Sequence, residues 1–281
     1  MSITGSHALA RFTRNIAAVA SALVIAALAL VAAFGPSLAP FGPLEQDLFN
    51  NFSGPTLKHP LGTDDLGRDT LSRLIYAGRV SLGISLTSVS IGLMVGTCLG
   101  LAAAYYRGWL DSLIMRLMDV LLSLPGMLLA VSIVALLQKG IPSTILAVAI
   151  YSVPTFARIV RGSALGILQL DYIGAARVMG ASDLRILFRH VLPNFLSPLI
   201  VRATLELGSA ILIASGLSFL GLGVQPPHPE WGAMLSKGRE LVRATPVVAI
   251  APGVAVTLAV LSFSLLGDGL RNALDPRLDR R

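Results

Sequence analysis

Two opposite charges lie inside an otherwise apolar stretch of the chain, where ionisable groups are most able to do chemistry. Arg202 and Glu206 are four residues apart, so on a helix their side chains share one face and can form an ion pair. Charges in lipid are unfavourable unless they pair, and they often mark a substrate or ion pathway. We favour a structural clamp for this intramembrane pair, with a substrate site as the alternative.

The apolar stretches carry no further set of groups for catalysis or proton transfer. All four histidines fall in other segments: His7, His59, His190 and His228. The sequence contains no G-x-x-x-x-G-K-[ST] loop, no H-E-x-x-H and no G-x-S-x-G. We therefore expect a non-catalytic chain that binds no metal and no cofactor itself. Any ATP hydrolysis that drives it must take place on another polypeptide.

Segment 171–194, DYIGAARVMGASDLRILFRHVLPN, is a polar interruption between two apolar runs, yet its pattern predicts structure. Gly180 follows a helix-forming stretch, where a left-handed residue can end a helix. Ser182 is a candidate cap for a second helix, and Asp183 suits its positive end. Pro193 is expected to stop this helix. The second helix is far too short to span a bilayer, which needs about 20 residues.

The predicted second helix has one apolar face. Its apolar residues recur at i, i+3, i+4 and i+7, as expected for one helical stripe: Leu184, Leu187, Phe188 and Val191. Arg185 and Arg189 lie on another face. This unit is built to be held by a partner surface. The alternative is an amphipathic helix that lies on lipid headgroups.

The composition indicates a polytopic membrane protein. Of 281 residues, 54% are hydrophobic and 13% are charged, whereas soluble domains carry about 25% charged residues. The formal net charge of +7 is accordingly interpreted by side of the membrane, not as a nucleic-acid surface. The single cysteine, Cys98, excludes an intramolecular disulfide.

Six apolar runs are long enough to span a bilayer: 16–34, 80–105, 114–137, 143–160, 195–221 and 246–267. The first run is longer than a typical signal-peptide core, so we interpret it as an uncleaved anchor. With the N-terminus inside, the inner segments carry more Lys and Arg than the outer ones. This bias places both termini and segment 161–194 in the cytoplasm, and segments 35–79 and 222–245 outside.

Small residues recur every four positions along the second apolar run: Ser88, Gly92, Gly96, Gly100 and Ala104. In lipid, small residues at this spacing allow another helix to approach closely. We expect this face to pack against a helix. Whether that helix belongs to this chain or to another one stays open.

Segment 171–194 resembles the cytoplasmic loop of permease subunits in binding-protein-dependent ABC importers, with the pattern E-A-A-x3-G-x9-I-x-L-P. Five positions match in register: Ala175, Ala176, Gly180, Leu192 and Pro193. Gly174 stands where the pattern has glutamate, and His190 where it has isoleucine. The resemblance implies that this loop docks into a groove on an ATPase subunit. Asp171, on a nearby helical face, is the candidate to replace the glutamate in part.

Three further strings resemble the second permease of dipeptide, oligopeptide and nickel importers. They are HPLGTDDLGRDTLSRLIYAGRVSLG (59–83), LSFLGLGVQPPHPEWGAML (217–235) and LLGDGLRNALDPRLDRR (265–281). Ala214 departs from this pattern, since many relatives carry a glutamate there. A calcium loop is the alternative for GTDDLGRD, but the string lacks the ligand spacing of a hand-type site.

The resemblance implies an all-α permease of the type I importer fold in a bacterial inner membrane. It would contact membrane lipid and work with a second homologous permease, two ATPase subunits holding ATP and Mg, and an external substrate-binding protein. The expected divisions are an anchor helix with an outer segment (1–78), a five-helix permease core (79–271) with its coupling loop (161–194), and a cytoplasmic tail (272–281).

The expected cargo of this ATP-driven importer is a di- or oligopeptide. A first alternative keeps this architecture but imports nickel chelates or another small solute. A second alternative, from a different class, is a secondary transporter that needs no ATPase and should show coupling-ion groups in its spans.

Overall fold

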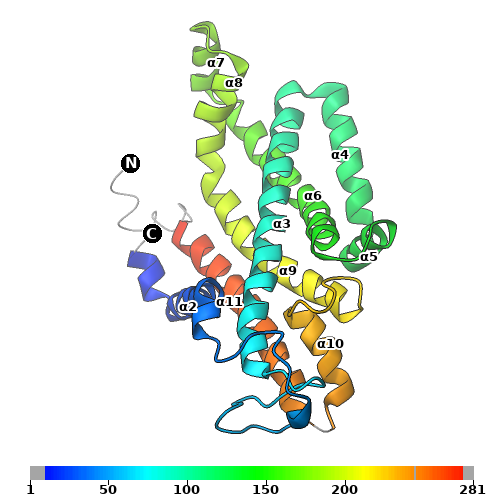
Figure 1. Cartoon of the computed structure of the whole chain (residues 1–281). Coiled ribbons are helices and arrows are strands. Elements are labelled where there is room, and N and C mark those ends of the chain that lie inside the picture. The colour runs from blue at the N-terminus through cyan, green and yellow to red at the C-terminus, as the bar shows by residue number, and fades with distance from the viewer. Residues whose placement is uncertain (1–9, 244, 275–281) are drawn as a thin grey trace.

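The computed structural model describes residues 10–243 and 245–274, and within these ranges the chain is helical and contains no β-strand. Figure 1 shows a bundle of long helices with irregular segments at both ends. In the described part, five helices are long and apolar enough to cross a membrane, and a bent pair can supply a sixth crossing. The predicted all-α, six-span class is confirmed. Most of the predicted tail, 275–281, lies outside the described residues.

Five single helices correspond to five of the predicted apolar runs, and four of the helices extend beyond their run. They are α2 (Ile16–Leu38), α3 (Thr70–Tyr106), α6 (Ile141–Ile167), α9 (Leu196–Phe219) and α11 (Pro246–Leu274). Helix α3 begins ten residues before the predicted run 80–105. Its early start follows from Asp69, whose side chain accepts a hydrogen bond from the backbone N–H of Ser72 at 2.7 Å and so caps the helix.

The predicted third run, 114–137, is not one straight helix. It is divided between α4 (Gly108–Ser123) and α5 (Gly126–Leu136), which meet at an angle of 97°. Pro125 explains the break, because proline has no backbone N–H and drives the residue before it into an extended conformation. Leu124 accordingly has φ −90° and ψ 134°.

The small-residue face of α3 packs against α6 of the same chain. A Cβ atom added to Gly96 would lie 2.6 Å from the Cβ of Phe156 and 2.7 Å from the carbonyl oxygen of Val153. Gly92 and Gly100 meet α6 equally closely. The structure thus identifies the neighbour of this face as an intramolecular helix. Any side chain at these positions would force the two backbones apart.

Different segments of the chain form the two ends of the bundle. At one end, the segment between α2 and α3, with a short 3₁₀ helix at Leu48–Asn50, lies near α10 (Trp231–Leu241). At the opposite end, α7 (Asp171–Val178) and α8 (Asp183–Arg185) project from α6 and α9 (Figure 1). The arrangement places segment 171–194 and the two outer segments on opposite sides of the bundle.

The main hydrophobic core runs from the spans into the projecting loop. Ile173, Ile186 and Val191 are fully buried and belong to the same cluster as Phe156 of α6. Burying such side chains contributes about 1.5–3 kcal/mol each. The loop is therefore part of the folded bundle and is positioned by it.

Candidate functional site

The turn at Gly180 closes α7 with a Schellman motif. The N–H of Ala181 donates to the carbonyl of Ala176 at 3.0 Å, and the N–H of Gly180 donates to the carbonyl of Arg177 at 2.9 Å. Gly180 has φ +79°, which glycine adopts without steric cost. An added Cβ would meet no atom within 4 Å. Glycine is thus needed here for its backbone conformation and not for space.

The helix after this turn begins where the sequence predicts, but by a different means. Ser182 occupies the capping position with φ −66° and ψ 154°, yet its side chain makes no capping hydrogen bond. The prediction that the Ser182 side chain caps this helix is therefore wrong, although the helix starts at the predicted residue. The start is fixed from another helix instead, because the Tyr105 hydroxyl of α3 donates a hydrogen bond to the Asp183 carboxylate.

Pro193 does not end the second helix. The chain passes from α8 through a π-helical turn (Ile186–Val191) and a 3₁₀ turn (Leu192–Phe195) directly into α9. Pro193 lies in the first turn of the 3₁₀ segment, where a missing N–H is tolerated. The side-chain amide of Asn194 donates to the carbonyl of His190 at 2.5 Å. The loop is consequently continuous with a membrane span.

The predicted apolar stripe is divided between two environments. Leu187 and Val191 are buried against the bundle, whereas Leu184 and Phe188 are 67% and 56% exposed. The irregular π-helical turn changes the register, so the four residues do not share one face. Exposed apolar side chains also lie at the end of α7: Val178 and Met179. We call Val178, Met179, Leu184 and Phe188 the loop patch.

The positions shared with the importer loop pattern occupy distinct places around the turn. Ala176 is buried, whereas Ala175 and Gly174 are exposed. An added Cβ at Gly174 would meet nothing within 4 Å, so the position of the missing glutamate faces open space. Asp171 is exposed in the first turn of α7 and forms no ion pair with residues 10–243 or 245–274. Leu192 is partly buried and Pro193 is exposed.

One departure from that pattern, at His190, is accommodated by local contacts. His190 replaces the isoleucine, and its ring lies beside that of Tyr172, with centroids 6.4 Å apart. The carbonyl of His190 accepts the hydrogen bond from Asn194, whose amide also donates to the Tyr172 hydroxyl at 3.2 Å. These contacts hold α7 against the π-helical turn.

Polar contacts that the sequence analysis did not find join α3 to the loop and α4 to α6. The Tyr105 hydroxyl bonds to Asp183, and the centroid of the Tyr105 ring lies 5.5 Å from the Arg177 guanidinium. Arg161 of α6 donates two hydrogen bonds to Asp111 of α4, at 2.5 and 2.6 Å. Residues 78 and 50 positions apart give no periodic signal, so sequence spacing could not reveal these pairs.

The intramembrane pair forms as an ion pair within α9. A guanidinium nitrogen of Arg202 lies 2.8 Å from one carboxylate oxygen of Glu206, and the Ser152 hydroxyl of α6 donates to the other oxygen at 3.3 Å. Glu206 is 1% exposed, while the Arg202 side chain is 36% exposed. Both carboxylate oxygens are therefore used inside the protein. This geometry favours the clamp over a substrate site for Glu206.

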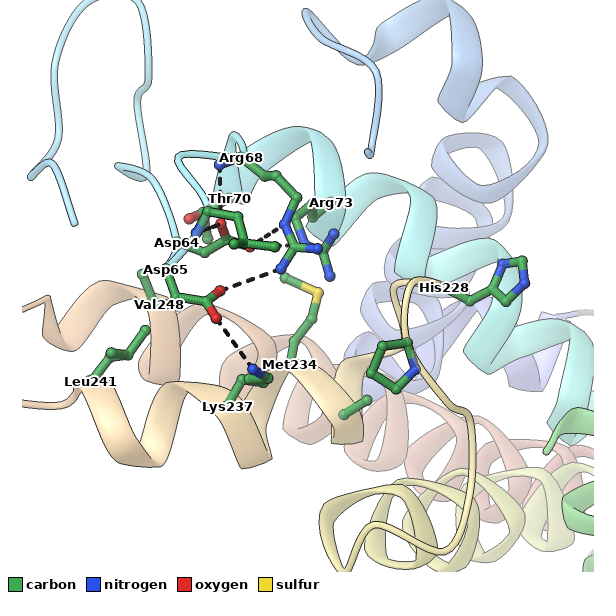
Figure 2. Close-up of a pocket in the computed structure, with 13 residues that line it drawn as sticks. Asp64, Asp65, Arg68, Thr70, Arg73, His228, Met234, Lys237, Leu241 and Val248 are labelled. Carbon is green, nitrogen blue, oxygen red and sulfur yellow. Dashed lines mark hydrogen bonds and ion pairs between the residues drawn. The ribbon is translucent and has the colours of Figure 1, made fainter. Parts of the chain in front are cut away.

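The outer segment is held by a network of charges that are largely buried. Figure 2 shows Asp65 between Arg68 and Lys237 of α10, at 3.3 and 3.2 Å. Arg68 also lies 2.8 Å from Asp64, which is 3.4 Å from Arg73. Because cations already occupy these carboxylates, they are unsuited to calcium. In the described part of the chain, no group of three His, Cys, Asp or Glu side chains could hold a metal ion.

The outer segment also folds tightly on itself. Gly67 has φ +69°, and an added Cβ would lie 1.8 Å from the backbone carbonyl oxygen of Asp47. The Asp47 side chain accepts a hydrogen bond from Asn50 at 2.7 Å, which holds the pKa of Asp47 below its ordinary value. The GTDDLGRD string thus supplies a close approach of two backbones and an ionic network.

Glu230 and Trp231 anchor α10 to α3, a role that the sequence analysis missed. Glu230 caps α10 by accepting from the N–H of Ala233 at 2.8 Å, and it accepts from the Ser81 hydroxyl at 3.1 Å. The indole N–H of Trp231 donates to the carbonyl of Leu74 at 3.2 Å. Glutamate is not among the residues that helices prefer at the N-cap, so the residue type alone did not indicate this cap.

Comparisons with protein families match most of the chain. Residues 96–280 match the family described as "Binding-protein-dependent transport system inner membrane component". Residues 5–55 match the "N-terminal TM domain of oligopeptide transport permease C". The first match contains α4 to α11 with the complete projecting loop, and the second contains α2.

Individual relatives match over nearly the full chain. The "Glutathione transport system permease protein GsiD" of Pectobacterium atrosepticum is 49% identical over 271 residues, covering 95% of this chain and 89% of the relative. Proteins of that name from Escherichia coli and Shigella boydii match to the same extent. A solved structure of the MetNI methionine ABC transporter in an inward facing conformation matches at a TM-score of 0.60 and 20% identity, covering 72% of this chain and 97% of that chain. At this identity, the likeness to the MetNI structure shows the fold alone.

Proposed function

We propose that this chain, which belongs to the family of binding-protein-dependent transport system inner membrane components, imports short peptides. It is a multi-pass inner-membrane permease subunit of an ABC importer. As a permease subunit it is non-catalytic, and the ATPase is on separate subunits. The proposal concerns the cargo, the partner subunits and the way that the loop transmits their motion.

The observation that carries the coupling mechanism is the loop patch, which is exposed while the loop beneath it is buried. Leu184 and Phe188 face outward, and Leu187 of the same turn is fixed in the core. An exposed apolar patch on a rigid support is suited to a protein partner. We assign this patch to the groove of an ATPase subunit, as the resemblance of the loop implies.

The helical continuity of the loop with α9 gives a route for the motion. When the ATPase subunits bind ATP and Mg and close, they would displace the loop patch. Because the chain is helical from Asp183 to Phe219, α9 would move with it. The Tyr105–Asp183 hydrogen bond would carry part of the displacement to α3. Alternating access in transporters is largely such rigid-body motion.

The proposed assembly contains this chain, a second homologous permease, two ATPase subunits and an external substrate-binding protein. The outer segment and α10 form the face that the binding protein would meet. The exposed apolar surfaces of the spans would contact membrane lipid and the second permease. The substrate class rests on the relatives, whose name specifies glutathione, a short peptide.

Uptake measurements in cells that lack the chromosomal copy of this gene test the function. Cells with the wild-type chain should accumulate labelled glutathione or dipeptides, and ATP depletion should stop the uptake. Gly180→Val should abolish uptake and peptide-stimulated ATP hydrolysis together, because valine disfavours φ +79°. Gly166→Val is the matched control, since Gly166 is exposed in α6 and an added Cβ meets nothing within 4 Å.

Different outcomes separate the competing functions. Uptake of a nickel chelate but of no peptide would show that the cargo is not a peptide, while the proposed ATP-driven mechanism would still hold. Uptake that follows an ion gradient and ignores ATP depletion would establish a secondary transporter. Full ATP-dependent uptake by Gly180→Val would remove the loop from the mechanism.

A further inference from the structure

A groove of about 540 Å³ opens where α6, α9 and α11 meet at their loop-side ends. Arg202 lies in the second turn of α9, which follows directly on the projecting loop, and Arg271 lies in the last turn of α11. Apolar side chains from all three helices form the wall: Ile159, Val201, Leu205 and Leu274. The groove therefore combines two guanidinium groups with an apolar surface at the cytoplasmic end of the spans.

The groove has an excess of positive charge. Glu206 neutralises Arg202 from beneath, but the Nε of Arg202 is buried and has no hydrogen-bond partner. Arg271 forms no ion pair with residues 10–243 or 245–274, although Asp268 lies only three positions earlier on α11. Among residues 10–243 and 245–274, none that lines the groove is acidic. An anion would satisfy the unpartnered donors.

We infer that this groove binds one anionic phospholipid of the cytoplasmic leaflet, with its phosphate between Arg202 and Arg271. Arginine holds phosphate through several charge-assisted hydrogen bonds. Basic pockets between membrane helices on the cytoplasmic side suit anionic headgroups. The acyl chains lie along Ile159 and Leu205, which is one turn deeper in α9 than Arg202, and continue into the bilayer.

The chemistry of the wall favours a lipid over the transported peptide. A peptide brings amide groups that lose their hydrogen bonds to water when they are buried, and these need replacements. Apart from the two arginines, the described side chains that line the groove offer one hydroxyl, that of Ser197. A lipid needs polar partners at its headgroup alone, which is the distribution that the groove shows.

The test compares the lipids retained by the complex purified through this chain. The complex is placed in nanodiscs with equal amounts of phosphatidylglycerol and phosphatidylcholine, extracted, and analysed by native mass spectrometry. The wild type should retain one phosphatidylglycerol in preference to phosphatidylcholine. Arg271→Gln should lower that preference about fivefold, the factor expected when one arginine's attraction to an anionic lipid is lost. The clamp between Arg202 and Glu206 stays intact in this variant.

Two further variants control for charge and for shape. Arg116→Gln removes the same charge from an exposed position on α4 and should leave the preference unchanged. Ser197→Trp keeps every charge but fills the groove, and it should abolish retention. Equal lipid preference in Arg271→Gln and Arg116→Gln would overturn the inference, as would retention by Ser197→Trp at the wild-type level.

Competing occupants are distinguished in the same preparation. Excess inorganic phosphate or excess peptide should leave the retained lipid in place, and displacement by either would reassign the groove to that anion. A cysteine introduced as Ser197→Cys in a Cys98→Ser background should not cross-link to another subunit. Such a cross-link would show that protein covers the groove and would overturn the lipid site.

Discussion

The two ends of this permease are built on opposite principles. At the outer end, Asp64 and Arg68 are buried, ion-paired and joined to α3. At the inner end, Gly180 stands in open space and Phe188 is 56% exposed. The outer segment pairs its buried aspartate and arginine charges internally. The loop at 171–194 presents apolar side chains that residues 10–243 and 245–274 leave exposed.

This difference indicates where each end obtains its stability. The outer end is self-sufficient, so substitutions there should act on folding. The inner end is incomplete without a partner, so substitutions in its exposed half should act on coupling and leave the fold intact. Matched substitutions at the two ends should separate the effect on folding from the effect on coupling.

The largest effect is expected at the outer end, for Gly67→Val. Valine disfavours φ +69°, at a cost of about 1–3 kcal/mol for the backbone conformation alone. In addition its Cβ would lie 1.8 Å from the Asp47 carbonyl oxygen, a clash that the fold can relieve only by moving one of the two backbones. The amount of folded chain in the membrane should fall sharply, as measured by immunoblot and size-exclusion chromatography. Gly54→Val is the control, because an added Cβ there meets nothing within 4 Å. A Gly67→Val chain at wild-type levels would show that the outer end tolerates disorder.

The second prediction divides the inner loop at one turn. Leu187→Ala, at a buried position, should lower the free energy of unfolding by about 2–5 kcal/mol. Phe188→Ala, at an exposed position, should leave the melting temperature unchanged but uncouple ATP hydrolysis from uptake. Thermal melts and ATPase assays on the same preparations measure both. If Phe188→Ala also lowers the melting temperature and coupling survives, the loop patch is structural.

Sequence spacing was sufficient for features that repeat or that end a helix. The apolar runs predicted the spans, since a run of about 20 apolar residues has few other solutions in a membrane protein. Gly180 has the positive φ that its place after a helix-forming stretch suggested. Both inferences depend on local rules that act within a few residues.

What the sequence could not predict depends on contacts between distant residues or on departures from ideal helices. The apolar stripe assumed 3.6 residues per turn, and the π-helical turn at Ile186–Val191 changed its register. Pro193 was expected to stop a helix, but the preceding turn adapts to it. The Tyr105–Asp183 and Glu230–Ser81 contacts join residues 78 and 149 positions apart. Neither pair leaves a trace in a single sequence.

A smaller effect is expected for Tyr105→Phe, which removes one connection between α3 and the inner loop. The hydroxyl bonds to Asp183 at an exposed position, so its loss should lower the free energy of unfolding by about 1 kcal/mol or less. Uptake per ATP hydrolysed should fall in part, because α9 still follows the loop. Tyr106→Phe is the control on the adjacent residue, whose ring is 63% exposed. If uptake per ATP hydrolysed is unchanged in Tyr105→Phe, the motion of the loop is transmitted through α9 and not through α3.

The smallest effect is expected for Lys237→Gln at the outer end. The Lys237 side chain is 55% exposed, and its partner Asp65 retains Arg68 at 3.3 Å. Exposed ion pairs contribute about 0.2–1 kcal/mol, and salt screens them. The melting temperature should therefore fall slightly, and the difference from the wild type should vanish in high salt. Helix α10 would still be held against α3 by the hydrogen bonds of Trp231 and Glu230. A large, salt-resistant loss of stability would mean that this one lysine fixes α10, and the outer end would then depend on a single exposed contact as much as the inner loop depends on its partner.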